Sequence, residues 1–286
     1  MVHLARKVFD WLFYRMSIRW PKLLARLSNE LPTRPVASLF SKAPKWERRI
    51  PNVVYQTWVE PFLGRTHCVA LAAFRELNSD FTFEFFSDAD ADAFMSDFYS
   101  DHPILEVYKN GLFGPLKADI FRYCLLFHYG GVYCDIGKAV RKPLRELIPS
   151  EASAVITWER RNSSPFPVSE TAKAVLQHPD RRILNWALMF APRHLLLKRV
   201  IDGIVEHYPA FRAVPVPLPK ESILEFTGPL WLTKCVLAAA EAGELDGIVQ
   251  AGIEFDGSAE WNLPGSYVRY VGRKAYILAR DQPIVS

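Results

Sequence analysis

Two aspartates and one arginine flank a pair of glycines in the middle of this chain. Asp119 and Arg122 lie three residues apart, and Asp135 follows Gly130 and Gly131 after a short apolar run. Residues three apart face the same side of a helix, so a helical segment would present Asp119 and Arg122 together. Carboxylates suit sugar hydroxyls or a hydrated metal ion, and a guanidinium suits phosphate or hydroxyl oxygens. The three side chains therefore predict a site for such a ligand, with a surface ion pair and a turn aspartate as the alternative.

The elements around these residues are expected to bring them together. The segment 114–131 has the pattern of a helix that begins near Pro115 and ends at Gly130. Its apolar stripe consists of Leu116, Ile120, Tyr123, Cys124 and Phe127. Residues 132–135 then predict a short strand, and a carboxylate at the end of such a strand points into the crevice where open α/β sheets bind ligands. We expect both aspartates and the arginine to converge there.

Alternating strand and helix patterns run along the chain from residue 50. Strands are expected at 50–58, 81–86, 153–158 and 183–191, and helices at 68–78, 87–98, 193–208 and 228–242. The acidic run after Ser87 is interpreted as helix capping rather than as a metal site. Residues 209–220 contain four prolines and predict a mobile loop, a candidate lid together with the C-terminal tail. This order of elements predicts a single α/β domain with a mainly parallel central sheet.

The composition is that of a globular protein with an uneven charge distribution. Of the 286 residues, 50% are hydrophobic and 23% are charged, which excludes a disordered chain and a coiled coil. Residues 1–49 contain 11 Lys or Arg and 3 Asp or Glu, whereas the rest of the chain carries a slight acidic excess. We therefore expect an anionic partner for residues 1–49 alone, and no nucleic acid partner. The predicted boundary separates residues 1–49, a basic helix with its connector, from a domain over 50–286.

Residues 2–28 predict an amphipathic helix. Its apolar face comprises Phe9, Leu12, Phe13, Met16 and Trp20, and its basic face comprises Arg15, Arg19, Lys22 and Arg26. This combination suits an anionic membrane surface, and the alternative is a helix docked on the protein's own core. Crossing a membrane needs about 20 mostly apolar residues, and the N-terminal segment has no such run.

The expected location follows from this segment and from the cysteines. The four cysteines include no CxxC pair, which argues against a disulfide framework or a zinc site and favours a reducing compartment. Cys124 and Cys134 lie in apolar segments and are expected to be buried free thiols. We expect a cytoplasmic protein that is peripheral on the inner face of the cytoplasmic membrane.

Residues 116–137 resemble the core signature of the DXD-containing sugar transferases of glycosyltransferase family 32. That signature is a K/S-x-D-x-x-R-Y helix followed by G-G-x-Y-x-D-x-D, and it is matched by Lys117, Asp119, Arg122, Tyr123, Gly130, Gly131, Tyr133 and Asp135. Weaker similarity occurs at 50–58, 77–94, 183–194, 226–234 and 261–267. The resemblance thus covers residues 50–267. It implies a GT-A fold, a UDP- or GDP-linked sugar donor, and transfer with retention of anomeric configuration.

The resemblance also implies roles for individual residues. It assigns catalysis to Asp119, Arg122 and Asp135, and donor binding to Gln56, Trp58, Lys117, Tyr133, Asn185, Ser266 and Tyr267. Trp58 would stack on the nucleotide base beside Gln56. Asp135 and Asn262 would be the ligands of a Mn²⁺ or Mg²⁺ ion.

One position departs from the family pattern. The second aspartate of the DXD motif is replaced by Gly137, which is followed by Lys138. A hard cation prefers carboxylate oxygens, and a glycine has no side chain to supply one. Either Asp135 and tail ligands hold a weaker metal site, or Lys138 binds the donor as a fixed cation for its diphosphate.

The expected reaction is transfer of a sugar to a hydroxyl of a surface glycan, such as capsule or lipopolysaccharide, or of a lipid-linked saccharide. One alternative is a toxin-like transferase that modifies a protein acceptor. The other is a non-catalytic relative that binds sugar nucleotides, for which the glycine in the motif is the main support.

Overall fold

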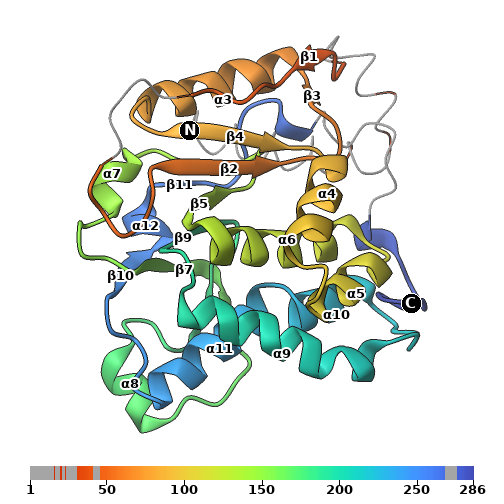
Figure 1. Cartoon of the computed structure of the whole chain (residues 1–286), viewed down its shortest axis with the longest axis vertical. Helices are drawn as coiled ribbons and strands as arrows, with labels where there is room; N and C mark the ends of the chain where they lie inside the picture. Colours follow the sequence, from red (N-terminus) through yellow and green to blue (C-terminus); the bar gives the residue numbers. More distant parts are fainter. Residues whose placement is uncertain (1–15, 17–19, 21–22, 24–30, 41–45, 268–275) are drawn as a thin grey trace.

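The computed structural model describes residues 31–40, 46–267 and 276–286, together with the single residues 16, 20 and 23 (Figure 1). The amphipathic helix expected over residues 2–28 lies outside the described residues apart from those single positions. The expected membrane contact of that segment therefore stays a prediction.

A seven-stranded mixed sheet forms the centre of the protein. Its order is β10 (Ile248–Ile253), β7 (Ala154–Ser163), β9 (Ala187–Phe190), β5 (Gly131–Cys134), β2 (Val53–Thr57) and β4 (Thr82–Phe86), and β8 (Arg181–Ile183) pairs with β7. The β2/β4, β2/β5 and β10/β7 pairs are parallel. Strand β9 runs antiparallel to both of its neighbours, and β8 is antiparallel to β7. The predicted α/β class is confirmed, and the sheet is mostly parallel with β9 inserted in the reverse direction.

Helices cover both faces of this sheet (Figure 1). They are α3 (Arg65–Leu77), α4 (Asp88–Phe98), α5 (Ile104–Asn110), α6 (Gly114–Tyr129), α7 (Leu144–Leu147), α8 (Glu170–Val175), α9 (Leu195–Phe211), α10 (Pro219–Phe226), α11 (Pro229–Glu241) and α12 (Glu254–Gly257). Side chains alternate along a strand, so Tyr55 of β2 joins the apolar core beneath α6, α9 and α11. Its neighbour Val54 joins a second core beneath α3 and α7.

Short elements complete the chain. They are β1 (Arg34–Pro35), β3 (Phe62–Leu63), β6 (Ala139–Val140), β11 (Ala259–Glu260) and the 3₁₀ turn Tyr276–Leu278. Strand β1 pairs antiparallel with β3, and Leu39 bridges to Phe83. This part of the expected connector therefore lies against the domain. The domain boundary at residue 50 stays a prediction.

Local sequence signals account for several helix ends. Ser87 caps α4, because its Oγ accepts from the backbone N–H of Asp90 over 3.2 Å while the Asp90 carboxylate accepts from the Ser87 N–H over 2.8 Å. The interpretation of this acidic run as helix capping is confirmed. The buried free thiols expected at Cys124 and Cys134 are also confirmed.

Two stretches differ from their predicted structure. Residues 183–191 are not one strand, because β8 ends at Ile183 and β9 begins at Ala187. The peptide groups between them bond elsewhere, since the Leu184 N–H donates to the Thr157 carbonyl over 2.9 Å and the Asp135 N–H donates to the Trp186 carbonyl over 2.9 Å.

The prediction of a single loop over residues 209–220 is wrong in part. Pro209 lies inside the last turn of α9, and Pro219 begins α10 at a helix position that needs no N–H donor. The residues between the two helices are tied to the C-terminal segment by isolated β-bridges, because Val216 bridges to Gln282 and Arg212 bridges to Val285.

One helical stretch among the described residues, Pro219–Glu241, is long and apolar enough by length and composition to cross a membrane. It comprises α10 and α11, and 78% of its most apolar window is buried inside the protein. That burial is typical of a core helix, and α11 contributes Trp231, Leu232 and Val236 to the core beneath the sheet.

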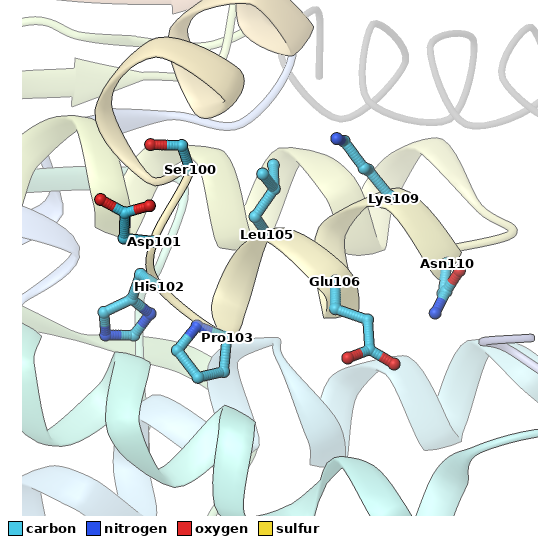
Figure 2. Close-up of a pocket in the computed structure, with 8 residues that line it drawn as sticks. All are labelled: Ser100, Asp101, His102, Pro103, Leu105, Glu106, Lys109 and Asn110. Carbon is cyan, nitrogen blue, oxygen red and sulfur yellow. The ribbon is translucent and has the colours of Figure 1, made fainter.

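A pocket of about 540 Å³ opens along α5 and is lined by side chains between Ser100 and Asn110 (Figure 2). None of its lining residues is among those that the sequence assigned to binding or catalysis. The polar cluster described next lies in another part of the fold.

Candidate functional site

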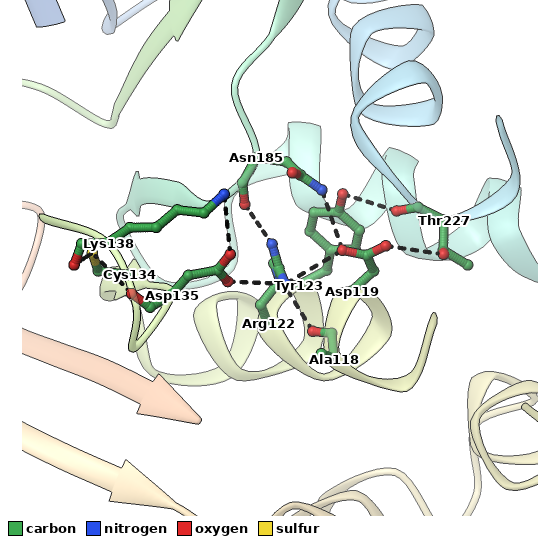
Figure 3. Close-up of polar contacts among 9 residues, drawn as sticks. All are labelled: Ala118, Asp119, Arg122, Tyr123, Cys134, Asp135, Lys138, Asn185 and Thr227. Atoms are coloured by element: carbon green, nitrogen blue, oxygen red, sulfur yellow. Dashed lines mark hydrogen bonds and ion pairs between the residues drawn. The ribbon is translucent and has the colours of Figure 1, made fainter. Parts of the chain in front are cut away.

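The double glycine between α6 and β5 brings the three polar side chains of the motif together. Gly130 has φ +66°, and a Cβ there would lie 2.6 Å from the Pro192 ring. Gly131 has φ +100°, and a Cβ there would lie 2.9 Å from the Val53 carbonyl oxygen. Only glycine adopts such backbone angles at so close an approach without strain. The chain therefore reverses within two residues and places Asp135 beside the helix that precedes it (Figure 3).

Arg122 is the centre of this cluster. Its Nη2 lies 3.4 Å from Asp119 Oδ1 and 3.3 Å from Asp135 Oδ1. Its Nη1 donates to the Asn185 carbonyl over 2.7 Å, and the guanidinium lies 4.5 Å from the centroid of the Tyr133 ring. Burial disfavours its charge, but the neighbouring Tyr133, Asp135 and Asp119 side chains raise the Arg122 pKa above its ordinary value. Arg122 is therefore a fixed cation that joins the two carboxylates.

Asp119 is buried, and each of its carboxylate oxygens accepts from a protein donor. Its Oδ1 accepts from Asn185 Nδ2 over 3.2 Å, and its Oδ2 accepts from Thr227 Oγ1 over 3.2 Å. Burial raises the pKa of Asp119 to about 7, against the opposing effect of Arg122 and of the two donors. Asp119 thus holds Arg122, Asn185 and Thr227 in place.

Asp135 is the more open of the two carboxylates. Its side chain is 29% exposed, whereas that of Asp119 is 9% exposed. Its Oδ2 lies 3.6 Å from Lys138 Nζ, and the Lys138 N–H donates to the Asp135 carbonyl over 2.9 Å in the turn that follows β5. A ligand that contacts Asp135 would therefore meet one carboxylate with a cation on each side (Figure 3).

Lys138 lies beside two tryptophans that sequence reasoning did not assign to the site. Its Nζ lies 5.1 Å from the ring centroid of Trp186 and 4.8 Å from that of Trp261. The two rings meet edge to face at 5.6 Å between centroids. Thr227 was also missed as a contact of Asp119. The available signal was that Thr227 and Trp261 lie within the weakly similar blocks 226–234 and 261–267.

Two predicted donor-binding residues lie against other elements. Gln56 is buried in β2, and its Oε1 accepts from Arg75 Nε over 3.3 Å and from Arg75 Nη2 over 3.0 Å. Lys117 Nζ lies 5.1 Å from the ring centroid of Tyr108 in α5. Trp58 follows β2 directly, is half-buried, and packs on the second apolar core. The structure thus does not join Gln56 or Lys117 to the Arg122 cluster through any contact in the described part of the chain.

The tail residues lie beside the turn that carries Lys138. The Leu263 N–H donates to the Gly137 carbonyl over 2.8 Å. Ser266 is buried, Tyr267 is half-buried and Asn262 is exposed. The backbone of this tail therefore contacts the turn after β5 at Gly137. The donor-binding roles of Ser266 and Tyr267 and the metal-binding role of Asn262 stay predictions.

The described side chains do not fit a resident Mn²⁺ or Mg²⁺ ion. The carboxylates of Asp119 and Asp135 both pair with Arg122, and Asp135 also pairs with Lys138. Gly137 supplies no oxygen from a side chain. Within the described residues, no group of three or more His, Cys, Asp or Glu side chains is arranged to hold a metal ion.

Comparisons with known proteins agree with the motif. Residues 66–154 match the family described as "Glycosyltransferase sugar-binding region containing DXD motif". This range contains Asp119, Arg122, Asp135 and Lys138. The match confirms the family resemblance that residues 116–137 indicated.

Curated relatives are similar over part of their length. The chain is 26% identical over 212 residues to a mannosyl phosphorylinositol ceramide synthase of Saccharomyces cerevisiae, which covers 71% of this chain and 46% of that protein. It is 30% identical over 169 residues to an initiation-specific alpha-1,6-mannosyltransferase of Candida albicans, which covers 54% of this chain and 43% of that protein. The chain therefore spans less than half the length of these relatives. Among solved structures, it resembles the PaToxG glycosyltransferase with a TM-score of 0.45 and 13% identity, over 96% of this chain and 93% of the other.

Proposed function

We propose that this protein transfers a sugar from a nucleotide-sugar donor to an acceptor hydroxyl. The proposal is supported by the match of residues 66–154 to the family described as a glycosyltransferase sugar-binding region containing a DXD motif. The arrangement that carries the proposal is Arg122 held between a buried Asp119 and an open Asp135. A GT-A type of nucleotide-sugar-binding domain over residues 50–286 is part of this proposal.

Asp135, Arg122 and Asp119 have different proposed roles in donor binding and sugar transfer. Asp135 offers an exposed carboxylate to donor hydroxyls, while Arg122 offers fixed N–H donors beside it. Asp119 acts through Arg122, since its own oxygens already accept from Asn185 and Thr227. In the reaction, the bond between the anomeric carbon and the diphosphate oxygen breaks, the acceptor oxygen bonds to that carbon, and the proton of the acceptor hydroxyl passes to the departing diphosphate oxygen. Preorganised charges lower the barrier because they need no reorientation during this step.

The state of the two carboxylates favours a reaction without a covalent glycosyl-enzyme. In such a reaction the acceptor attacks the anomeric carbon on the face from which the diphosphate leaves. Asp119 is buried with a protein donor on each carboxylate oxygen, and Asp135 is paired with two cations, so neither is a free nucleophile. Attack of the acceptor on the face that the diphosphate leaves would retain the anomeric configuration. Product analysis by NMR would show the configuration of the new bond, and inversion would contradict this part of the proposal.

Mannose is the proposed sugar. The relatives are named as a mannosyl phosphorylinositol ceramide synthase and an initiation-specific alpha-1,6-mannosyltransferase. The proposed acceptor is accordingly a hydroxyl of a glycan or of a lipid such as an inositol phosphoceramide.

A donor screen with purified full-length protein tests the proposed function. Labelled GDP-mannose and a set of UDP-sugars are supplied with inositol phosphoceramide or with mannose oligosaccharides, and label is followed into the lipid and glycan fractions. Transfer from GDP-mannose to either fraction is expected. Label in the protein fraction would favour a protein acceptor. Binding of nucleotide without turnover of any donor would identify a non-catalytic relative.

We also propose that residues 2–28 attach the protein to an anionic membrane surface on its cytoplasmic side. The support is the excess of Lys and Arg over residues 1–49 beside the apolar face of the helix that the sequence predicts. Sedimentation with vesicles that contain phosphatidylserine is expected, and sedimentation with neutral phosphatidylcholine vesicles is not. Equal binding to both would contradict the electrostatic part of the proposal, and binding to neither would contradict the whole.

A further inference from the structure

The ammonium group of Lys138 is held by one carboxylate and two aromatic rings. Its Nζ lies 3.6 Å from Asp135 Oδ2, 5.1 Å from the Trp186 ring centroid and 4.8 Å from the Trp261 ring centroid. The Lys138 side chain is only 19% exposed. A cation over the face of an indole is attracted by the ring, and more strongly when water is partly excluded. Lys138 is therefore a positioned charge at the edge of the site.

The tail that supplies one of these rings is tied to the same turn. Strand β11 pairs with β6, which begins directly after Lys138. Beyond it, the Leu263 N–H donates to the Gly137 carbonyl over 2.8 Å. The Trp261 ring is fixed by its own Nε1–H, which donates to Glu254 Oε1 over 2.9 Å. The ring and the lysine thus keep their relative position through backbone and side-chain contacts.

The carboxylate beside Lys138 is already balanced by cations. Asp135 Oδ1 lies 3.3 Å from Arg122 Nη2, and Oδ2 lies 3.6 Å from Lys138 Nζ. A divalent ion at this point would have to displace the ammonium, and it would meet Gly137 where the DXD motif has its second carboxylate. The Lys138 ammonium and a divalent ion would therefore occupy the same position beside Asp135, and in this protein the ammonium occupies it.

The indole N–H of Trp186, in the ring next to Lys138, is a buried hydrogen-bond donor without an acceptor among the described residues. Trp186 is 2% exposed. A buried N–H without an acceptor is costly, and an anionic oxygen is its natural complement. This donor is part of the ring over which Lys138 lies, so an unsatisfied N–H and the ammonium belong to one group of side chains.

We propose that Lys138 takes the place of the divalent metal at the donor diphosphate, so that donor binding and sugar transfer need no metal ion. This inference rests on the proposed function and specifies its chemistry. When the bond to the anomeric carbon breaks, its electron pair stays on the diphosphate oxygen. Lys138 Nζ donates a hydrogen bond to the diphosphate and keeps its proton, and Trp186 and Trp261 hold it at that position.

Binding of nucleoside diphosphates to the full-length protein tests the inference without relying on turnover. Calorimetry with UDP and with GDP is carried out in EDTA and again with Mn²⁺ in excess. For the diphosphate that binds, we expect dissociation constants in the two buffers that agree within about twofold. Lys138→Met keeps an apolar stem beside the rings and removes the charge, and it should weaken diphosphate binding about 10- to 150-fold. Lys138→Arg should restore most of the affinity.

The matched control is Lys142→Ala. Lys142 lies four residues along the chain, is 44% exposed, and pairs with Asp256, so diphosphate binding should be unchanged. A thermal unfolding curve for each variant separates lost charge from lost structure. If Lys138→Met does not fold, the comparison of EDTA and Mn²⁺ on the unaltered protein decides alone.

Different experimental results would overturn the role of Lys138 and the proposed function. Diphosphate binding that disappears in EDTA, or wild-type affinity in a folded Lys138→Met protein, overturns the role of Lys138 and leaves the proposed function standing. Absence of binding to both diphosphates in both buffers overturns the proposed function, and the role of Lys138 with it.

Discussion

Thr227 Oγ1 donates a hydrogen bond to Asp119 Oδ2 over 3.2 Å, although 108 residues separate the two in the chain. The contact joins the junction of α10 and α11 to the first half of α6. Tyr123 strengthens the same junction, because its hydroxyl donates to the Thr227 carbonyl over 3.0 Å. The carboxylate that positions Arg122 therefore depends on a residue from the C-terminal third of the protein.

Replacement of Thr227 by Val tests this dependence. The variant keeps the shape of the side chain but leaves Asp119 Oδ2 buried with one donor fewer. The free energy of unfolding should fall by about 1–3 kcal/mol, and sugar transfer should fall with it as Arg122 is held less firmly. Denaturant unfolding measures the first effect, with the exposed Thr171→Val as the control. Unchanged stability would show that the Thr227 contact does not hold Asp119.

Asp135→Asn should separate function from folding. The amide keeps the shape of the carboxylate and removes its charge at a partly exposed position, so the fold should survive. Loss of a charge-assisted contact costs about 1.5–3 kcal/mol, which corresponds to a rate that is about 10- to 150-fold lower if the contact acts in the transition state. Steady-state kinetics with the donor measures this loss. Asp97→Asn on the exposed face of α4 is the control, and full activity of folded Asp135→Asn would refute the assignment of this residue.

The buried Asp119 should make stability depend on pH in a defined direction. Burial raises its pKa to about 7 in the folded protein, above the value of about 3.9 expected in the unfolded chain. A raised folded pKa favours the protonated native state, so this contribution is fully present below pH 4 and is lost as pH rises to about 7.

The difference in unfolding free energy between the wild type and Asp119→Asn isolates this contribution. Relative to the variant, the wild type should lose stability from pH 4 to pH 7 and then remain level to pH 8. Chemical denaturation at several pH values provides the measurement. A difference that stays constant or rises with pH would show that Asp119 is ionised throughout that range.

The double glycine should be intolerant of any side chain. In Gly130→Ala, a Cβ would lie 2.6 Å from the Pro192 ring at φ +66°, so both strain and overlap are expected. The stability cost should be at least about 1–3 kcal/mol. Gly114→Ala in the first turn of α6 is a matched control, because a Cβ there has no neighbour within 4 Å. Equal stability of the two variants in urea unfolding would contradict this account of the turn.

The sequence alone determined the parts of this protein that depend on neighbours in the chain. Pro115 and Gly130 set the ends of α6, and Ser87 with Asp90 set the start of α4. The spacing of three residues placed Asp119 and Arg122 on one helix face, and the turn after β5 kept Asp135 close behind the glycines. These features follow from backbone geometry and local hydrogen bonds, which a short window of sequence contains.

Only the tertiary structure decided which distant residues complete the site. Asn185 and Thr227 reach Asp119 from 66 and 108 residues away, and Trp186 and Trp261 reach Lys138 from separate elements. Strand β9 enters the sheet in reverse between β5 and β7, and this insertion carries Asn185 and Trp186 to the motif. Such contacts depend on the order and direction of the strands in the sheet. Local propensity does not encode that order, because each strand can pair with several partners that bury its apolar side chains equally well.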